Sequence, residues 1–349
     1  MKKYKICKIL LVILAIFLCV AFYELLGICV AYKKQPEVSN TTKKETKNGS
    51  WNECSENTER AVIIEKNPEA LLQRVRLIKN AKKEIILSTF AFQSDESGKL
   101  ILGALHDAAD RGVHIRLLVD GMESWIDMEG NPYFYGLSSH ENVEIKLYNK
   151  ANPLKPWKMM GRMHDKYLIA DGKRYILGGR NTYNYFLGDF PGHKNYDRDV
   201  LVVCDEPEKE NSVNQLLEYF ETIWEQEDSG YFHDNKKLAN RKSVKNAVLE
   251  LQNGYQKYFE ENKERICDTD YTDETFETEK IALVSNPIHT GSKEPVVWYQ
   301  LGELMKNAKN RVKIHTPYII CNDMMYNTWE EIAENVSDFS IMTNSVANN

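Results

Sequence analysis

A histidine and a lysine separated by one residue, His164 and Lys166, are the side chains of this sequence best suited to chemistry. Successive side chains of a strand alternate between its two faces, so these two are expected on the same face. A neutral imidazole there can attack a phosphorus atom, while a fixed ammonium stabilises the charge that builds on the phosphate oxygens. We therefore expect the pair to act on a phosphate ester.

The residues that follow extend this pattern over 162–181, which reads RMHDKYLIADGKRYILGGRN. Asp171 and the glycine after it are a strong signal for a turn, which would join the first strand to a second one in a hairpin. Gly178 lets the backbone approach a ligand closely, and Asn181 can donate hydrogen bonds to phosphate oxygens. Each residue alone has an ordinary structural explanation, and Arg162 is either surface or a phosphate-binding group. The joint spacing is what favours a site.

The elements that must position these side chains follow from hydrophobic periodicity. Helical periodicity alternates with short apolar runs, which is typical of an α/β layered domain with a largely buried sheet. The predicted helices are 68–83, 98–112 and 211–227, and the predicted strands are 84–92, 113–121 and 198–205. The strand at 113–121 leaves an aspartate at its end.

The N-terminal segment is different in kind. Residues 9–32 are apolar apart from Glu24 and are long enough to span the ~30 Å hydrocarbon core of a bilayer. The run is longer than the core of a signal peptide and lacks a clear cleavage site, so we expect a single-pass cell-membrane anchor. The lysines before it favour a cytoplasmic N-terminus and an extracytoplasmic globular part. The net charge of -6 argues against a strongly basic surface for nucleic acid.

An internal repeat predicts a second lobe. The stretches LIKNAKKEIILSTFAF at 77–92 and LMKNAKNRVKIHTPYI at 304–319 share their pattern, with position 304 corresponding to position 77. A counterpart of His164 would fall near position 391, beyond Asn349, so we expect only the opening of this lobe here. The predicted division is 1–32 anchor, 33–59 polar flexible stem, 60–228 catalytic lobe, 229–280 charged connector and 281–349 start of the second lobe.

The motif residues also carry a family resemblance. They fit the pattern HxKx4Dx6GxxN at every position, and the sequence resembles the phospholipase D superfamily from about Arg60 onward. The later stretches YDRDVLVV and YFETIW make it similar to the bacterial cardiolipin synthase branch. The resemblance implies a two-lobed α/β/α sandwich whose active site forms where two HxK motifs meet. The residues that fit the pattern are His164, Lys166, Asp171, Gly178 and Asn181.

The resemblance also assigns roles. It implies that one histidine, for which His164 is the candidate, becomes a covalent phosphohistidine, and that the other protonates the leaving alcohol and activates the acceptor; which of the two is attacked first stays open on the sequence. Lys166, Gly178 and Asn181 would bind the phosphate, Asp171 would support the histidine, and neither a metal nor another cofactor is required. No other histidine of this sequence begins an HxK; the nearest, HIR at 114–116, lies in a core strand pattern.

Several functions stay open on the sequence. The leading hypothesis is a membrane-anchored phosphatidyltransferase with phospholipid substrates, its site completed by a homodimer or a missing C-terminal half. The alternatives are a phospholipase D that releases phosphatidic acid, a homodimeric single-motif nuclease, and an inactive fragment; the charge and the repeat speak against nucleic acid. Two smaller questions also stay open. Aromatic residues after the strand at 113–121 form either core or a lipid-facing lip of the site; they are Trp125, Tyr133, Phe134 and Tyr135. A disulfide is possible among four scattered cysteines, with no pairing favoured by the sequence; they are Cys54, Cys204, Cys267 and Cys321.

Overall fold

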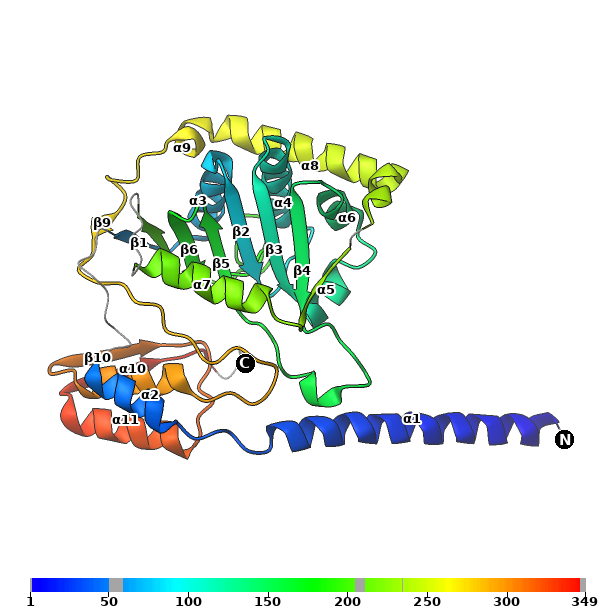
Figure 1. Cartoon of the computed structure of the whole chain (residues 1–349), viewed down its shortest axis with the longest axis horizontal. Helices are drawn as coiled ribbons and strands as arrows, with labels where there is room; N and C mark the ends of the chain where they lie inside the picture. The colour runs from blue at the N-terminus through cyan, green and yellow to red at the C-terminus, as the bar shows by residue number, and fades with distance from the viewer. Residues whose placement is uncertain (1, 50–58, 205–210, 234, 346–349) are drawn as a thin grey trace. The chain divides into compact units, whose positions relative to one another are not determined.

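The computed structural model describes residues 2–49, 59–204, 211–233 and 235–345 (Figure 1). The chain divides into two compact units. The first comprises Met1–Lys33 and Cys54–Leu283, and the second comprises Lys34–Glu53 and Val284–Asn349.

A nine-stranded mixed sheet forms the centre of the first unit. The three adjacent strands β2, β3 and β4 are parallel, as the alternating helices and strands predict, and antiparallel strands continue the sheet from β2 through β5. The order across the sheet is β8 (Ser229–Tyr231), β4 (Val143–Tyr148), β3 (His114–Asp120), β2 (Glu84–Thr89), β5 (Lys166–Ala170), β6 (Arg174–Gly178), β7 (Asp199–Val203), β1 (Arg60–Ile64) and β9 (Phe276–Glu277).

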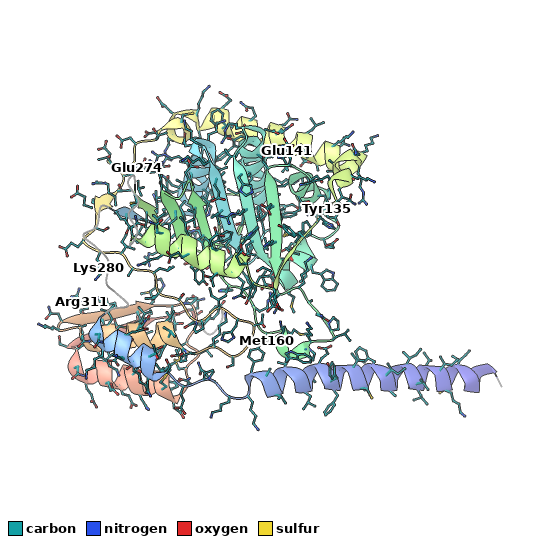
Figure 2. The ribbon with its side chains drawn as sticks, in the orientation of Figure 1. Tyr135, Glu141, Met160, Glu274, Lys280 and Arg311 are labelled. Carbon is teal, nitrogen blue, oxygen red and sulfur yellow. The ribbon has the colours of Figure 1, made fainter. Side chains whose placement is uncertain are left out.

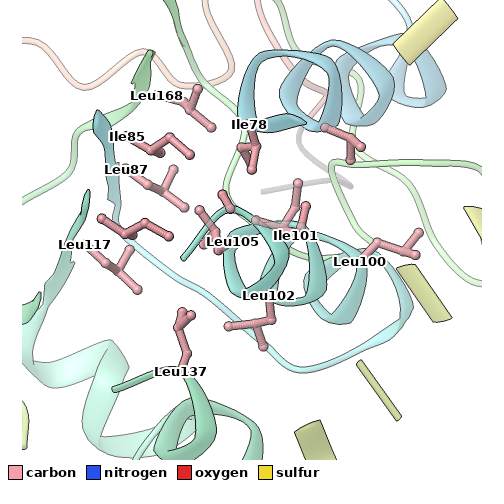
Figure 3. Close-up of a cluster of buried hydrophobic side chains, with 14 of the residues drawn as sticks. Ile78, Ile85, Leu87, Leu100, Ile101, Leu102, Leu105, Leu117, Leu137 and Leu168 are labelled. Carbon is pink, nitrogen blue, oxygen red and sulfur yellow. The ribbon is translucent and has the colours of Figure 1, made fainter. Parts of the chain in front are cut away.

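Helices cover both faces of this sheet. On one face lie α3 (Asn67–Asn80), α4 (Glu96–Asp110) and α6 (Pro132–Ser138), and Figure 3 shows leucine and isoleucine side chains from these helices meeting those of β2, β3 and β5. On the other face lies α7 (Ser212–Trp224), where Phe220 and Trp224 are buried. The short helix α5 (Gly121–Asp127) follows β3 directly. The predicted α/β/α sandwich is confirmed.

The expected connector, residues 229–280, is part of the first lobe. Helix α8 (Lys242–Glu261) packs outside α4 and α6, and Gly103 of α4 lies so close to Leu251 that no side chain fits there (Figure 1). Strands β8 and β9 extend the sheet at its two edges. Between them along the chain come the short elements η3 (Lys236–Asn240) and α9 (Lys263–Cys267), before and after α8. The charges of this region occupy the outer face of an amphipathic helix whose inner face is buried; that inner face comprises Val244, Ala247, Leu251, Tyr255 and Phe259.

A buried arginine fixes the last part of this region. The guanidinium of Arg76, 1% exposed, donates to the backbone carbonyls of Asp268 and Asp270 and to the carboxylate of Glu274. Several charge-assisted hydrogen bonds on one buried cation are strong interactions. They explain why an acidic segment that resembles a linker lies folded against α3.

The second unit repeats the start of the first. Its elements are α10 (Val296–Lys306), β10 (Arg311–His315), α11 (Asp323–Asn335) and β11 (Asp338–Met342), with β10 and β11 parallel. β10 begins at Arg311 where β2 begins at Glu84, and α11 begins at Asp323 where α4 begins at Glu96. Both pairs keep the correspondence that relates position 304 to position 77, so the sequence repeat is also a repeat of folded elements.

The expected flexible stem contains a helix, α2 (Asn40–Asn48), that belongs to the second unit. Ser39 caps it, and Glu294 accepts hydrogen bonds from the Ser39 amide at 2.8 Å and the Thr42 hydroxyl at 2.7 Å. The prediction of a flexible segment is wrong for these residues because cap and carboxylate hold the helix. Residues 50–58, including Cys54, lie outside the described residues.

The N-terminal helix α1 (Lys2–Tyr32) contains the apolar run. Residues Ile6–Tyr32 contain an 18-residue stretch with a mean hydropathy of 2.9 and are long and apolar enough to cross a membrane by length and composition. Among the described cysteines outside this helix, Cys267 and Cys321 form no disulfide.

Candidate functional site

The candidate site lies at one edge of the central sheet. β2 ends beside the start of β5, with Thr89 opposite Lys166, and β6 ends beside the start of β7, with Gly178 opposite Asp199. β3 also ends at this edge, with Asp120 as its last residue. In α/β sheets the carboxyl ends of parallel strands are the usual place for a binding site.

His164 and Lys166 share one aromatic side chain at this edge. The His164 ring meets the Phe90 ring edge-to-face at 4.7 Å between centroids, and the Lys166 ammonium lies 5.2 Å from the same ring. The residue between them, Asp165, instead accepts a hydrogen bond from Tyr219 of α7 at 2.8 Å. The predicted alternation is therefore present: histidine and lysine lie together, away from α7.

The environment favours a neutral histidine beside a charged lysine. Loss of solvent lowers the pKa of His164, the positive charges of Lys166 and Arg162 lower it further, and Asp120 opposes them. Burial lowers the pKa of Lys166 to about 8, although Asp165, Asp197 and Asp120 pull it upward. At neutral pH the imidazole is thus available as a nucleophile and the lysine still carries its proton.

A buried carboxylate at the end of β3 orients the start of the motif strand. Asp120, 1% exposed, accepts hydrogen bonds from Arg162 Nε at 2.8 Å and from the Met163 amide at 3.0 Å. It also caps α5 through the amides of Met122 and Glu123. Asp120 therefore links α5 to the two residues that directly precede His164.

Arg162 is held by protein carboxylates. Its guanidinium pairs with Asp120 at 2.7 Å and with Glu123 at 2.9 Å, and it lies 5.0 Å from the centre of the Phe90 ring. Of the two roles left open by the sequence, a structural one fits this geometry, because both carboxylates already neutralise the charge. The guanidinium helps to fix Phe90 and hence the histidine ring.

Asn181 lies beside the residues that follow β2, while the glycines before it serve the fold. Asn181 is 7% exposed, and its side-chain oxygen accepts a hydrogen bond from the Ala91 amide at 3.3 Å. Any side chain at Gly178 would overlap Asp199, and one at Gly179 would overlap the Asp197 carboxylate. The sequence predicts that a ligand approaches the backbone at Gly178; in the structure, the carboxylates of Asp199 and Asp197 occupy the space beside these glycines.

Asp199 forms a buried ion cluster beneath this corner. Its carboxylate lies 2.9 Å from Arg74 of α3 and 3.3 Å from Arg180. Arg180 also donates to the carbonyls of Ile64 and Glu65, so β1, β7 and α3 are joined to the residue before Asn181. The cluster fixes the backbone that carries Asn181.

Asp171 lies away from the site, at the other end of β5. About five residues of strand, at ~3.3 Å each, separate it from Lys166. Its carboxylate accepts hydrogen bonds from the amides of Lys82, Lys83 and Glu84 at 2.7 to 3.1 Å. Asp171 and Gly172 both have positive φ, 55° and 62°, as the turn requires. The geometry thus gives Asp171 a tethering role in place of the expected support of the histidine.

Two other sequence expectations concern residues around the site. Phe134 and Tyr135 are buried and Tyr133 is half-buried, so these three are core, whereas Trp125 of α5 is 68% exposed. His114 sits between Glu84 and Glu144 at the start of β3, opposite the candidate site, which agrees with a structural histidine. Sequence reasoning missed Phe90, Asp120 and Asp197; the only signal for them was an aspartate at a strand end.

Comparison with known proteins identifies the class of this domain. Residues 74–224 match the family model described as "Cardiolipin synthase, PLD-like domain". The matched segment contains the whole motif and most of the sheet. Residues 74–224 are thus similar to a phospholipase D-like domain, and the resemblance predicted from the motif is confirmed.

Particular relatives share parts of the chain. An uncharacterized protein of Helicobacter pylori (strain ATCC 700392 / 26695) is 28% identical over 82% of this chain and 59% of its own length. Cardiolipin synthase C of Escherichia coli (strain K12) is 29% identical over 45% of this chain and 34% of its own length. The chain therefore spans only part of the curated relatives it matches.

A solved structure agrees with the fold over most of the chain. Phosphatidylserine synthase of Haemophilus influenzae superposes with a TM-score of 0.59 at 16% identity, covering 87% of this chain and 66% of that one. At this identity the likeness shows the fold alone.

Proposed function

We propose that this protein is a membrane-anchored phosphatidyltransferase of the cardiolipin synthase type that works through a phosphohistidine. The observation that carries the proposal is the placement of His164 and Lys166 against the same Phe90 ring, at the edge of a sheet that matches a phospholipase D-like domain. The candidate membrane span α1 and the cardiolipin synthase relatives support a phospholipid substrate and a bilayer location.

The proposed reaction has two displacements at phosphorus. An imidazole nitrogen of His164 attacks the donor phosphodiester, the bond to one alcohol breaks, and a general acid protonates the departing oxygen. A second alcohol, deprotonated by the same group, then attacks the phosphohistidine and releases a neutral His164. Lys166 and the Asn181 amide stabilise the negative phosphate oxygens in both steps.

The general acid is assigned to a second histidine-lysine pair, which the sequence 1–349 does not contain. We propose that a second polypeptide, such as another copy of this chain, or further residues of the second lobe supply it. With water in place of the second alcohol, the same chemistry gives a phospholipase D that releases phosphatidic acid.

The test incubates the full chain in vesicles of phosphatidylglycerol and phosphatidylethanolamine, over a range of protein-to-lipid ratios, and follows the lipid products. Cardiolipin formation that rises steeply with protein density supports a transferase completed by a second copy. Phosphatidic acid as the sole product replaces the transferase with the hydrolase.

A covalent-trapping experiment tests the histidine without needing turnover. Full chain is mixed with phospholipid carrying labelled phosphate and denatured in base, which preserves phosphohistidine. We expect label on the wild type and on the control His114→Ala, and none on His164→Ala. Equal label on both variants would contradict the assignment of His164.

A further inference from the structure

The loop between β4 and β5, residues 149–161, exposes large apolar side chains. Leu154 is 78% exposed, Trp157 46% and Met160 56%, and the short helical turn η2 (Pro156–Lys158) lies among them. Figure 2 shows Met160 on this loop, beyond the end of the sheet. Loops on protein surfaces are usually polar, and a group of exposed apolar side chains marks an interaction surface.

The base of this loop is fixed. Asn149 has a positive φ of 51°, and its side-chain amide donates to the carbonyls of Lys158 at 2.6 Å and Gly161 at 2.9 Å. The backbone N–H of Asn149 also donates a hydrogen bond to the backbone carbonyl of Asp228 at 2.7 Å. One asparagine thus closes the loop on itself and holds it to the sheet, so the apolar side chains are presented by a defined structure.

Lysines accompany the apolar side chains. The loop carries Lys150, Lys155 and Lys158, and they line a cavity of about 190 Å³ together with residues of α5 and of the segment 227–230. Lys158 pairs with Asp228 at 2.6 Å, whereas Lys155 is exposed and has no ion pair among the described residues. Tryptophan with aliphatic side chains and lysine is the composition that binds the interface of an anionic bilayer.

The candidate membrane span touches this loop within the first unit. Tyr23 of α1 donates a hydrogen bond to the Leu154 carbonyl at 3.1 Å, and a side-chain carbon at Gly27 would lie 2.5 Å from Pro156 Cγ. Gly27 and Tyr23 are five and nine residues before the end of the span at Tyr32, or about 8 Å and 14 Å along a helix, so the loop packs along the last turns of the span. A loop packed at that level lies at the depth where acyl chains meet headgroups.

The loop leads directly into the motif. Gly161 is followed by Arg162, which contacts Phe90, and His164 comes two residues later. An anchored loop would therefore set the height of His164 above the bilayer, close to the phosphate layer.

We propose that residues 149–161 are a membrane-docking loop. Leu154, Trp157 and Met160 enter the interface of an anionic bilayer, and Lys155 contacts lipid phosphates from above. This deepens the proposed function, since docking brings a lipid phosphodiester to His164, but it concerns a surface whose binding can be measured without catalysis.

The test uses photo-crosslinking in the full chain. Leu154→p-benzoylphenylalanine and the control Leu249→p-benzoylphenylalanine, at a leucine 57% exposed on α8, are placed in vesicles of phosphatidylglycerol and phosphatidylcholine with traces of radiolabelled phosphatidylglycerol. We expect strong lipid adducts after illumination at position 154 and background labelling at position 249. Equal yields at the two positions would overturn the proposal.

Two further arms separate docking from catalysis and from proximity to the anchor. Adding His164→Ala should leave the adduct at position 154 unchanged, because docking does not need the nucleophile. Adding Lys155→Gln should reduce it by up to about fivefold, the effect of one basic residue near an anionic surface. If the adduct at position 154 is lost in the His164→Ala background, the labelled lipid is substrate held in the site, and docking is refuted. If the adduct yield changes neither with Lys155→Gln nor with the phosphatidylglycerol content of the vesicles, the contact with anionic lipid is refuted.

Discussion

Replacing Asp120 with asparagine tests whether a buried carboxylate positions the motif strand. In wild type one carboxylate oxygen accepts from Arg162 and from the α5 amides, and the other accepts from the Met163 amide. An asparagine has only one acceptor oxygen, so its NH2 group must face either Met163 N–H or the Arg162 guanidinium. The substitution therefore removes a charge and sets a donor against a donor.

The magnitude follows from these contacts. A lost charge-assisted bond costs about 1.5–3 kcal/mol and an unsatisfied buried amide about 1–3 kcal/mol. The ionic part is reduced because the Arg162 side chain is 24% exposed. We expect Asp120→Asn to lower the free energy of unfolding of the first unit by about 3 kcal/mol, which for a unit of this size lowers Tm by about 9 °C.

The same substitution should change the histidine in a defined direction. The negative charge of Asp120 raises the pKa of His164 against burial and two cations, so its removal should lower that pKa further. Thermal unfolding of the full chain in detergent measures Tm, and NMR titration of the His164 ring, assigned with His164→Ala, measures the pKa.

The control is Glu123→Gln, which removes the more exposed partner of Arg162 and should cost less than about 1 kcal/mol. An Asp120→Asn protein with an unchanged Tm, or with a raised His164 pKa, would refute the positioning role.

Three further predictions concern the motif. Activity should fall at acid pH, below the ordinary histidine range, as His164 takes up a proton, and at alkaline pH above about 8 as Lys166 loses its proton. In Lys166→Arg the alkaline limb of the pH profile should disappear, because arginine keeps its charge. An alkaline limb that stays near pH 8 in this variant would assign the titration to another group. Asp171→Asn should lower the free energy of unfolding by about 2 kcal/mol in a denaturant titration, while the His164 pKa stays unchanged; a shifted pKa would return Asp171 to the site. Gly179→Ala should displace Asp197 and lower the Lys166 pKa, moving the alkaline limb to lower pH, and an unmoved limb would show that Asp197 does not act on the lysine.

The sequence predicted the elements and the placement of His164 beside Lys166 because both depend on local patterns. Helical and strand periodicity places α3, β2, α4 and β3, and period two places His164 and Lys166 on one face. The spacing of the internal repeat also carried over to the folded elements, since β10 and α11 stand where β2 and α4 predict them. These signals need no knowledge of which distant segments meet.

The remaining features depend on contacts between distant segments. Phe90 follows β2 and Asp120 ends β3, more than forty residues before the histidine, and apart from the position of Asp120 at a strand end their local sequence gives no sign that they lie near His164. Asp171 was predicted to support the histidine because it belongs to the same short motif. The residues between Lys166 and Asp171 form strand β5, however, and a strand of that length places its two ends at opposite edges of the sheet. The acidic connector hid the buried face of α8 behind its surface charge.

The tether formed by Asp171 bears on how the protein is made. β2 pairs with β3 through a crossover that contains α4, but its other neighbour, β5, is translated about 80 residues later. At ~5–20 residues per second the open side of β2 waits for several seconds during synthesis, and an unpaired strand edge invites aggregation. The hairpin formed by β5 and β6 is also the piece that closes this edge, and Asp171 fastens it to Glu84 at the start of β2 and to the two residues before it. Damage to the tether would therefore first reduce the yield of folded protein in the cell and only then the rate of each molecule.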